Sequence, residues 1–92
     1  MTVPFDARVS VPADVLVQEL DGESVLLNLN GGLYYGLDDV GTRIWAALTK
    51  CQSVEHAYET LLTEFDVEPD LLKKDLVALV EKLIENGLVE LG

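Results

Sequence analysis

Between residues 14 and 37, apolar and polar side chains alternate or form short apolar runs, a spacing typical of β-strands. Residues 14–20 and 24–29 are two such segments, and the dipeptide Asp21-Gly22 between them is a strong signal for a two-residue hairpin turn. A third segment, residues 33–37, follows the turn residues Asn30-Gly31-Gly32. Consecutive strands usually pair, so we expect an antiparallel meander with the first and third strands at its edges.

The second of these strands separates polar from apolar residues by face. Successive side chains point to opposite faces of a sheet. The polar positions Ser24, Asn28 and Asn30 therefore fall on one side, and Val25, Leu27 and Leu29 fall on the other.

After residue 38 the apolar spacing becomes helical. Asp38 and Asp39 are the N-cap candidates for a first helix, in which we expect Trp45 to be a core aromatic residue. Ser53 is the N-cap candidate for a second amphipathic helix over residues 54–65. The rest of the chain is therefore predicted to be mainly helical.

A third helix is predicted from Pro69, which suits the first helical position, to about Asn86. Asn86-Gly87 is a typical left-handed helix C-cap, after which Leu88 can fold back against the last turn. At 100° per residue, the main apolar stripe of this helix comprises Leu72, Leu76, Leu79 and Leu83. Three further residues, Val77, Val80 and Ile84, widen the apolar arc, and Lys73 lies within that extension.

Two interpretations of this wide arc stay open. The helix can pack against two elements at once, or Val77, Val80 and Ile84 can form one wall of a groove beside the third strand. An edge strand next to an apolar helix face suits the capture of an extended peptide, which adds to the sheet through main-chain hydrogen bonds. The second interpretation thus predicts a peptide-binding site.

The predicted fold class is α+β, with a three-stranded antiparallel N-terminal meander followed by three helices in a winged helix-turn-helix-like arrangement. Ninety-two residues make one small domain. Residues 1–13 contain Pro4 and Pro12 and are expected to be an extended N-terminal arm, and residues 14–92 form the folded domain.

Six Lys and Arg residues stand against seventeen Asp and Glu residues, for a formal net charge of −11. Such a chain repels phosphate, so nucleic acid is excluded as a partner and a winged-helix DNA-binding regulator is a disfavoured alternative. No apolar run reaches the roughly 20 residues needed to cross a membrane, and the single cysteine, Cys51, fits a reducing cytoplasm.

The sequence contains no recognisable catalytic constellation. His56 is the only histidine, and its spacing from Cys51 is not one that Cys-His catalytic pairs require. One Cys and one His also cannot fill a tetrahedral metal site without carboxylates. We therefore expect a protein that is not an enzyme and that uses neither cofactor nor metal.

Residues Leu27 to Trp45 carry the run Leu-Asn-Leu-x-x-Gly-x-Tyr-Tyr-x-Leu-Asp-x-Val-Gly-x-Arg-Ile-Trp. This run resembles the PqqD-like family, also called RiPP precursor recognition elements, and the resemblance extends over residues 15–91. Members of that family bind the N-terminal leader of a ribosomally made precursor peptide as an added strand. The resemblance implies a binding strand of Leu33, Tyr34, Tyr35, Gly36 and Leu37, and a helical wall that draws on Lys73, Val77, Val80, Glu81 and Ile84.

Within the family, the Tyr-Tyr-x-Leu-Asp and Val-Gly-x-Arg-Ile-Trp runs are most similar to the leader-binding proteins of lasso-peptide biosynthesis. That resemblance implies three partners, namely the precursor, a leader peptidase and an ATP-dependent macrolactam cyclase. The alternative is a peptide chaperone for a radical-SAM enzyme, as in pyrroloquinoline quinone synthesis. In both cases the expected role is that of a non-enzymatic adaptor.

Overall fold

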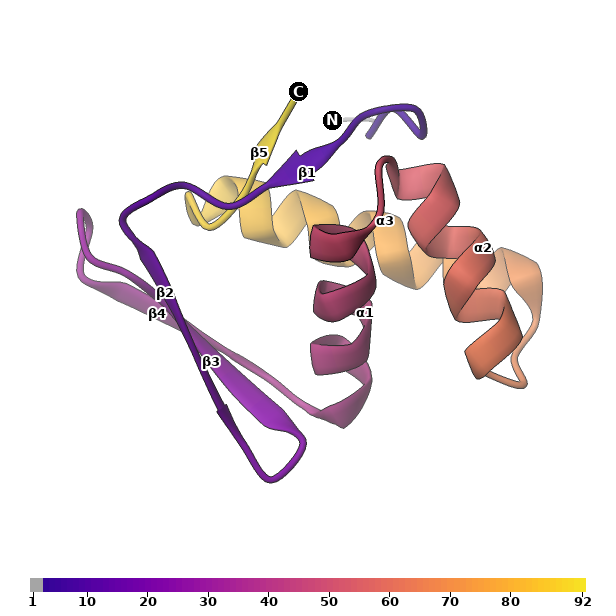
Figure 1. Ribbon diagram of the computed structural model, residues 1–92, viewed down its shortest axis with the longest axis horizontal. Coiled ribbons are helices and arrows are strands. Elements are labelled where there is room, and N and C mark those ends of the chain that lie inside the picture. Colours follow the sequence, from indigo (N-terminus) through magenta and orange to yellow (C-terminus); the bar gives the residue numbers. More distant parts are fainter. Residues whose placement is uncertain (1–2) are drawn as a thin grey trace.

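The computed structural model describes residues 3–92 and has two small sheets and three helices (Figure 1). The elements in chain order are β1 (Val9–Ser10), β2 (Val15–Leu20), β3 (Glu23–Asn28), β4 (Leu33–Leu37), α1 (Asp39–Lys50), α2 (Val54–Glu64), α3 (Pro69–Glu85) and β5 (Glu90–Leu91). The predicted α+β class and the order of three strands before three helices are confirmed.

The larger sheet has the strand order β2-β3-β4, and both pairings are antiparallel. Asp21 and Gly22 have φ values of 54° and 84°, as a tight hairpin turn with two left-handed residues requires. Leu26 lies at the centre of the register, opposite Val17 on one side and Tyr35 on the other. The predicted meander is therefore confirmed, and β2 and β4 are its edges.

Side chains cap the first two helices where the sequence predicts them. The Asp38 carboxylate accepts a hydrogen bond from the Gly41 N–H at 2.7 Å, and the Ser53 hydroxyl accepts one from the His56 N–H at 3.1 Å. Asp39 instead lies in the first turn of α1, where its carboxylate is 3.6 Å from Arg43 Nε. Asp38 alone is thus the N-cap of α1.

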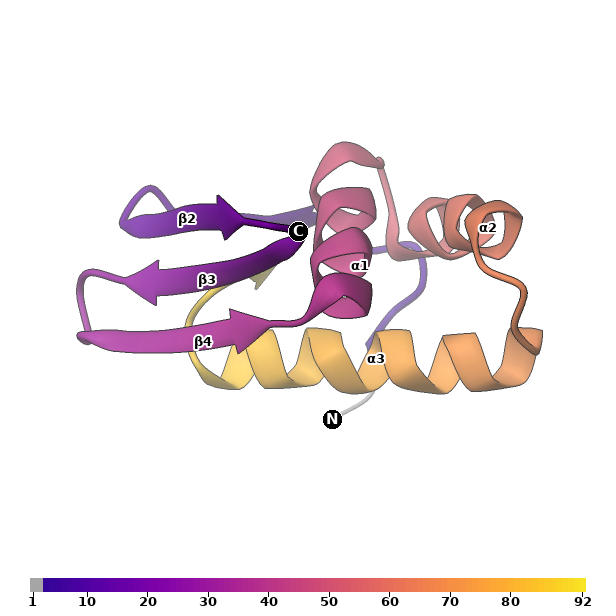
Figure 2. The same ribbon diagram turned by 90° about the horizontal axis from the view of Figure 1, so that it is seen from below.

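The helix α3 is the base of the molecule, and the sheet, α1 and α2 lie along one side of it (Figure 2). The core between them includes Trp45, as predicted, and it has the largest fully buried side chains at Leu26, Leu48, Val54, Leu61, Leu76, Val80, Leu83 and Leu88. Four of these come from α3 or the residue that folds back after it. Burial of one face of α3 therefore holds the two halves of the chain together.

The N-terminal segment packs against the helices along much of its length. Val3, Ala7 and Val9 are buried, and the carbonyl of Ala7 accepts a hydrogen bond from the Val54 N–H at 2.9 Å. β1 then pairs antiparallel with β5 at the C-terminus. Residues 3–13 are thus joined to the helices and to the last strand. In the described residues, 3–92, no helix has the length and apolar character needed to cross a membrane.

The end of α3 offers a stability prediction. Gly87 has a φ of 68°, and a Cβ built on it would lie 2.9 Å from Asn28 Nδ2. We expect Gly87→Ala to lower the free energy of unfolding by about 1–2 kcal/mol because left-handed backbone is unfavourable for residues with a Cβ.

Thermal unfolding followed by circular dichroism measures this loss. Gly31→Ala is the matched control, since a Cβ there meets no atom within 4 Å. An equal effect of the two substitutions would contradict the explanation from backbone geometry.

Candidate functional site

β4 presents one open edge of the larger sheet. Its inner edge pairs with β3, and within residues 3–92 no other strand pairs with its outer edge. Tyr34 is 76% exposed and Leu33 is also exposed, whereas Tyr35 is half-buried and Leu37 is buried. The backbone groups of residues 33–37 that face this edge are the unpaired donors and acceptors of an edge strand.

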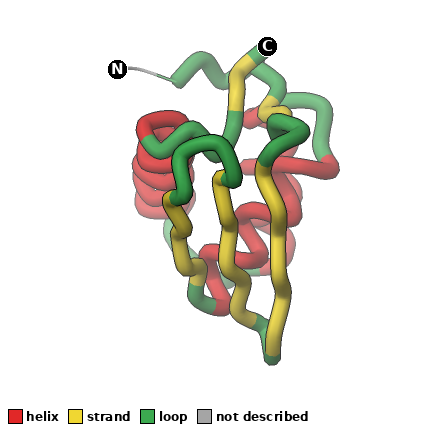
Figure 3. Tube along the Cα trace, turned by 90° about the vertical axis from the view of Figure 1, so that its left-hand side faces the viewer, coloured by secondary structure: helices red, strands yellow, loops and turns green. Residues whose placement is uncertain are grey.

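The open edge of β4 lies on the side of the sheet nearest to α3. Figure 2 shows β4 as the strand of the larger sheet that lies closest to α3, and Figure 3 shows a helix beside one of the two outer strands. The last residue of β3, Asn28, is connected to the chain just after α3, because its side-chain amide donates to the carbonyls of Asn86 at 3.4 Å and Gly87 at 3.3 Å. The end of α3 is thus held against the β3–β4 hairpin.

One flank of α3 faces the N-terminal segment. The Lys73 ammonium lies 4.8 Å from the centre of the Phe5 ring, a cation–π contact. The Phe5 ring packs in turn against Tyr58 of α2, with 5.7 Å between ring centres. Lys73 therefore contacts residues that lie well before β4 in the chain.

Of the other α3 residues that the resemblance implies, three lie on the same flank of the helix as Lys73, and one lies in the core. At 100° per residue, Lys73, Val77, Glu81 and Ile84 fall within an arc of about 80°. Their side chains are exposed at Lys73 and half-buried at the other three positions. Val80 is fully buried in the core, so it does not line an open groove. The five β4 residues thus form one strand, and four of the five α3 residues share one flank of the helix, whereas Val80 lies in the core.

The opposite flank of α3 is the one that faces the start of α1. Here a pocket of about 100 Å³ lies between the two helices. It is lined by Val40 and Ile44 of α1, Phe65 and Val67 of the α2–α3 connection, and Leu71, Leu72 and Asp75 of α3. Because α1 begins two residues after β4 ends, Val40 brings this pocket near the C-terminal end of β4.

Sequence reasoning did not find this pocket. A signal was available, since Val67, Leu71 and Asp75 lie four residues apart, the spacing of neighbours on a helix face. Val67, however, precedes Pro69 and lies outside the predicted helix. The contribution of α1 to the pocket follows only from the packing of the helices.

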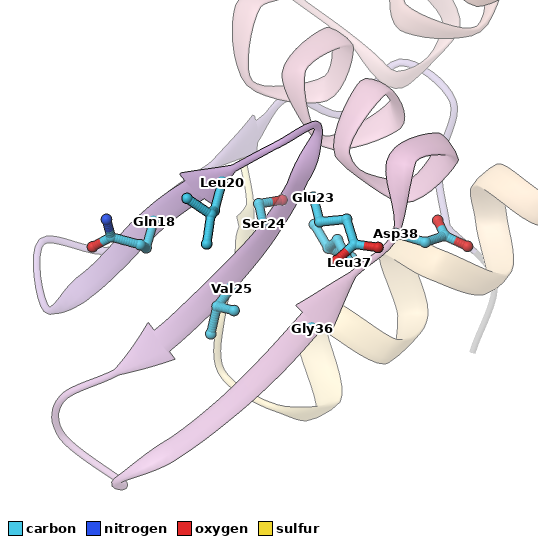
Figure 4. Close-up of a pocket in the computed structure, with 8 residues that line it drawn as sticks. All are labelled: Gln18, Leu20, Glu23, Ser24, Val25, Gly36, Leu37 and Asp38. Carbon is cyan, nitrogen blue, oxygen red and sulfur yellow. The ribbon is translucent and has the colours of Figure 1, made fainter.

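The outer face of the sheet, away from α3, carries a larger pocket of about 380 Å³ (Figure 4). Its apolar lining comes from Leu20, Val25 and Leu37, and its polar lining includes Gln18, Glu23 and Asp38. The inward face of β3 carries the fully buried Leu26 and Ser24, whose hydroxyl is 2.7 Å from the Thr42 hydroxyl. On the outer face, Val25 is 43% exposed.

Cys51 and His56 have separate local contacts. The Cys51 sulfur lies 3.8 Å from the Thr60 hydroxyl, and His56 is exposed in the first turn of α2. In the part of the chain that the structure describes, no cluster of three or more His, Cys, Asp or Glu residues could hold a metal ion.

Residues 23–89 match the family model described as coenzyme PQQ synthesis protein D (PqqD). No curated protein matches the chain.

Two solved structures are similar over nearly the whole chain. TbiB1 in complex with the TbiA(beta) leader peptide is 32% identical, with a TM-score of 0.80 and coverage of 87% of this chain and 93% of that one. Lasso peptide synthetase B1 complexed with the leader peptide is 30% identical, with a TM-score of 0.81 and coverage of 91% and 99%. Because the family model covers more than half of the chain and both structures are at least 30% identical over most of it, this chain belongs to the PqqD family.

Proposed function

We propose that this protein binds the leader segment of a ribosomally synthesised precursor peptide as an added strand on the open edge of β4. The observation that carries the proposal is that edge, residues 33–37, lying unpaired beside α3. Support comes from the two similar structures, each of which is a complex with a leader peptide. The backbone of all five β4 residues forms the binding strand, although the Leu37 side chain stays in the core.

Main-chain hydrogen bonds and a few apolar side chains can together supply the binding free energy that a peptide carrier needs. About four or five net hydrogen bonds contribute about 1 kcal/mol each, and about two or three apolar anchors contribute about 1.5–3 kcal/mol each. Ordering a flexible peptide costs about 2–5 kcal/mol, and association entropy reduces the sum further. The expected dissociation constant is therefore about micromolar or somewhat lower, which suits a carrier that must release its cargo.

The role of the bound state is to bring the precursor to its enzymes. An adaptor that holds the leader raises the local concentration of the precursor near any enzyme that also binds the adaptor. Similarity to two proteins of the lasso-peptide synthetase B1 type favours a leader peptidase and a macrolactam cyclase as those enzymes. The adaptor itself performs no catalysis in this scheme and is expected to act in the cytoplasm.

The family model favours one alternative for the enzyme partner. It describes a protein of coenzyme PQQ synthesis, and the partner in that case is a radical-SAM enzyme. A pull-down with the leader-loaded protein distinguishes these alternatives. The protein is offered a leader peptidase and a macrolactam cyclase in one experiment and a radical-SAM enzyme in another. Retention of the radical-SAM enzyme alone would overturn the lasso-peptide assignment.

Hydrogen exchange tests the binding mode directly. The precursor leader encoded beside this protein should slow the exchange of alternate backbone amides within residues 33–37, because alternate N–H groups of an edge strand face the added strand. Amides of β2, the other edge, serve as the internal control and should keep their exchange rates. Protection of β2 with no change in β4 would place the peptide on the wrong edge for this proposal.

A further inference from the structure

We propose that β2, the second open edge of the larger sheet, pairs antiparallel with β2 of a second copy of this chain. The two three-stranded sheets then form one six-stranded sheet. The two β4 strands lie at opposite ends of that sheet, so each open edge stays free for its own leader peptide. The inference does not depend on the proposed function, because pairing through β2 uses no residue of β4.

The outer edge of β2 is open and apolar. Within residues 3–92 no strand pairs with it, and Figure 2 shows β2 on the side of the sheet away from α3. Its residues 16–20 are all exposed, including Leu16 at 53%, Val17 at 42% and Leu20 at 72%. Proteins commonly protect an edge strand with Lys, Pro or a very short length. β2 has six residues and neither Lys nor Pro, so its edge is available for main-chain pairing.

The side chains of β2 are complementary to themselves. Val17 is opposite the buried Leu26 on the inner face, so Leu16, Gln18 and Leu20 lie on the outer face. When two copies pair with Gln18 opposite Gln18, Leu16 of each copy lies opposite Leu20 of the other. Exposed leucines then cover each other twice, and the two Gln18 amides can each donate and accept a hydrogen bond. This self-complementarity favours a second copy over an unrelated protein.

The Asp21-Gly22 turn determines which peptide groups of β2 face outward. The residues that flank a two-residue hairpin, here Leu20 and Glu23, exchange hydrogen bonds, and bonded and non-bonded pairs then alternate along the strands. The peptide groups of Val17 and Glu19 therefore face the open edge. Pairing centred on Gln18 places Val17 of one copy opposite Glu19 of the other, which gives about four main-chain hydrogen bonds in the dimer.

The charge of the chain limits the strength of this pairing. Glu19 is the one charged residue of β2, and it lies on the inner face, opposite Val17 of the second copy. Each copy carries a net charge of −11, so the two repel each other. A contact one strand wide is also smaller than the roughly 1,200–2,000 Å² that stable interfaces bury. We therefore expect a transient dimer that forms at high protein concentration and is strengthened by added salt.

Cysteine cross-linking tests the register. Gln18→Cys, in a chain with Cys51→Ser, places two thiols at a non-hydrogen-bonded pair, where Cβ atoms are about 4.5–5.5 Å apart. Mild oxidation should link this variant at least about tenfold faster than Leu20→Cys in the same background, because the two Leu20 positions lie about 13 Å apart along the paired strands, beyond the reach of a disulfide. Leu20→Cys is the matched control, since Leu20 is 72% exposed. Equal or faster linkage of Leu20→Cys would indicate random collision and overturn the proposal.

Nuclear magnetic resonance tests the same pairing without a cross-link. Raising the concentration of the wild-type protein from about 0.05 to about 1 mM should shift the amide signals of residues 15–20, and more strongly in about 0.5 M salt. Val17→Pro should abolish the shifts, because it removes a donor on the open edge and keeps the bonds to β3. Leu16→Glu replaces it if circular dichroism shows that the proline variant is unfolded.

Three outcomes of this experiment would overturn the proposal. These are signals that do not change with concentration at either salt, shifts confined to β4, and shifts that persist unchanged in the folded edge variant. None of them bears on leader binding, which is measured at low protein concentration.

Discussion

Replacing Val80 by aspartate should unfold the domain, and loss of peptide binding would then be a consequence of unfolding. Val80 is fully buried on the face of α3 that includes Leu76 and Leu83. The substitution removes about 1.5–3 kcal/mol of apolar burial and adds the cost of burying a carboxylate without a partner, which is several kcal/mol more. A domain of this size has a total stability of about 5–15 kcal/mol. The expected loss is therefore comparable to the whole stability of the fold.

Thermal unfolding and near-ultraviolet circular dichroism measure this effect. Val25→Asp is the matched control, because Val25 is exposed on the outer face of the sheet and its aspartate stays in water. We expect a cooperative transition for Val25→Asp and its loss, or a very large decrease in melting temperature, for Val80→Asp. A stable and folded Val80→Asp protein would contradict the burial of this residue and would return it to the list of candidate groove residues.

Replacing Tyr34 by proline should weaken leader binding about tenfold or more if the Tyr34 N–H faces the open edge of β4. Proline removes the backbone donor and its ring obstructs the approach of an added strand. The leader carbonyl that loses this donor is left unsatisfied in the complex, at a cost of about 1–3 kcal/mol, and each 1.4 kcal/mol is a tenfold change in affinity.

Tyr34→Ala separates the backbone from the side chain. It keeps the N–H and removes only a ring that is 76% exposed, so its affinity should be close to that of the wild-type protein. If Tyr34→Pro instead lowers the melting temperature strongly, the Tyr34 N–H pairs with β3, and Tyr35→Pro becomes the variant that probes the open edge. Full affinity in whichever proline variant remains stable would show that the leader docks elsewhere.

Local rules were enough to predict most of the secondary structure. Asp21-Gly22 forms the predicted hairpin turn because both residues tolerate positive φ. Asp38 and Ser53 begin helices because a short polar side chain can accept a hydrogen bond from the first turn. At the end of α3, Gly87 takes the left-handed conformation, and the Leu88 N–H donates to the Leu83 carbonyl at 2.9 Å. Each of these interactions spans only a few residues.

The surroundings of α3 could not be predicted in the same way. Helical periodicity predicts which residues share a flank, but the rotation of the helix against the sheet depends on contacts with residues far away in the chain. Phe5 beside Lys73 and Asn28 beside Asn86 set that rotation, across 68 and 58 residues of sequence. The sequence therefore showed the wide apolar arc of α3, but it did not show that Val80 within that arc is buried in the core.

The sequence by itself predicted the three-stranded meander, the three helices with their first two caps, the edge strand at residues 33–37 and a net charge of −11. Only the tertiary structure decided that Val80 belongs to the core, that the N-terminal segment packs on the helices, and that Lys73 contacts Phe5. The physical reason is the separation along the chain of the residues that interact. Turns, caps and strand alternation depend on neighbouring residues, whereas burial depends on which distant surfaces meet.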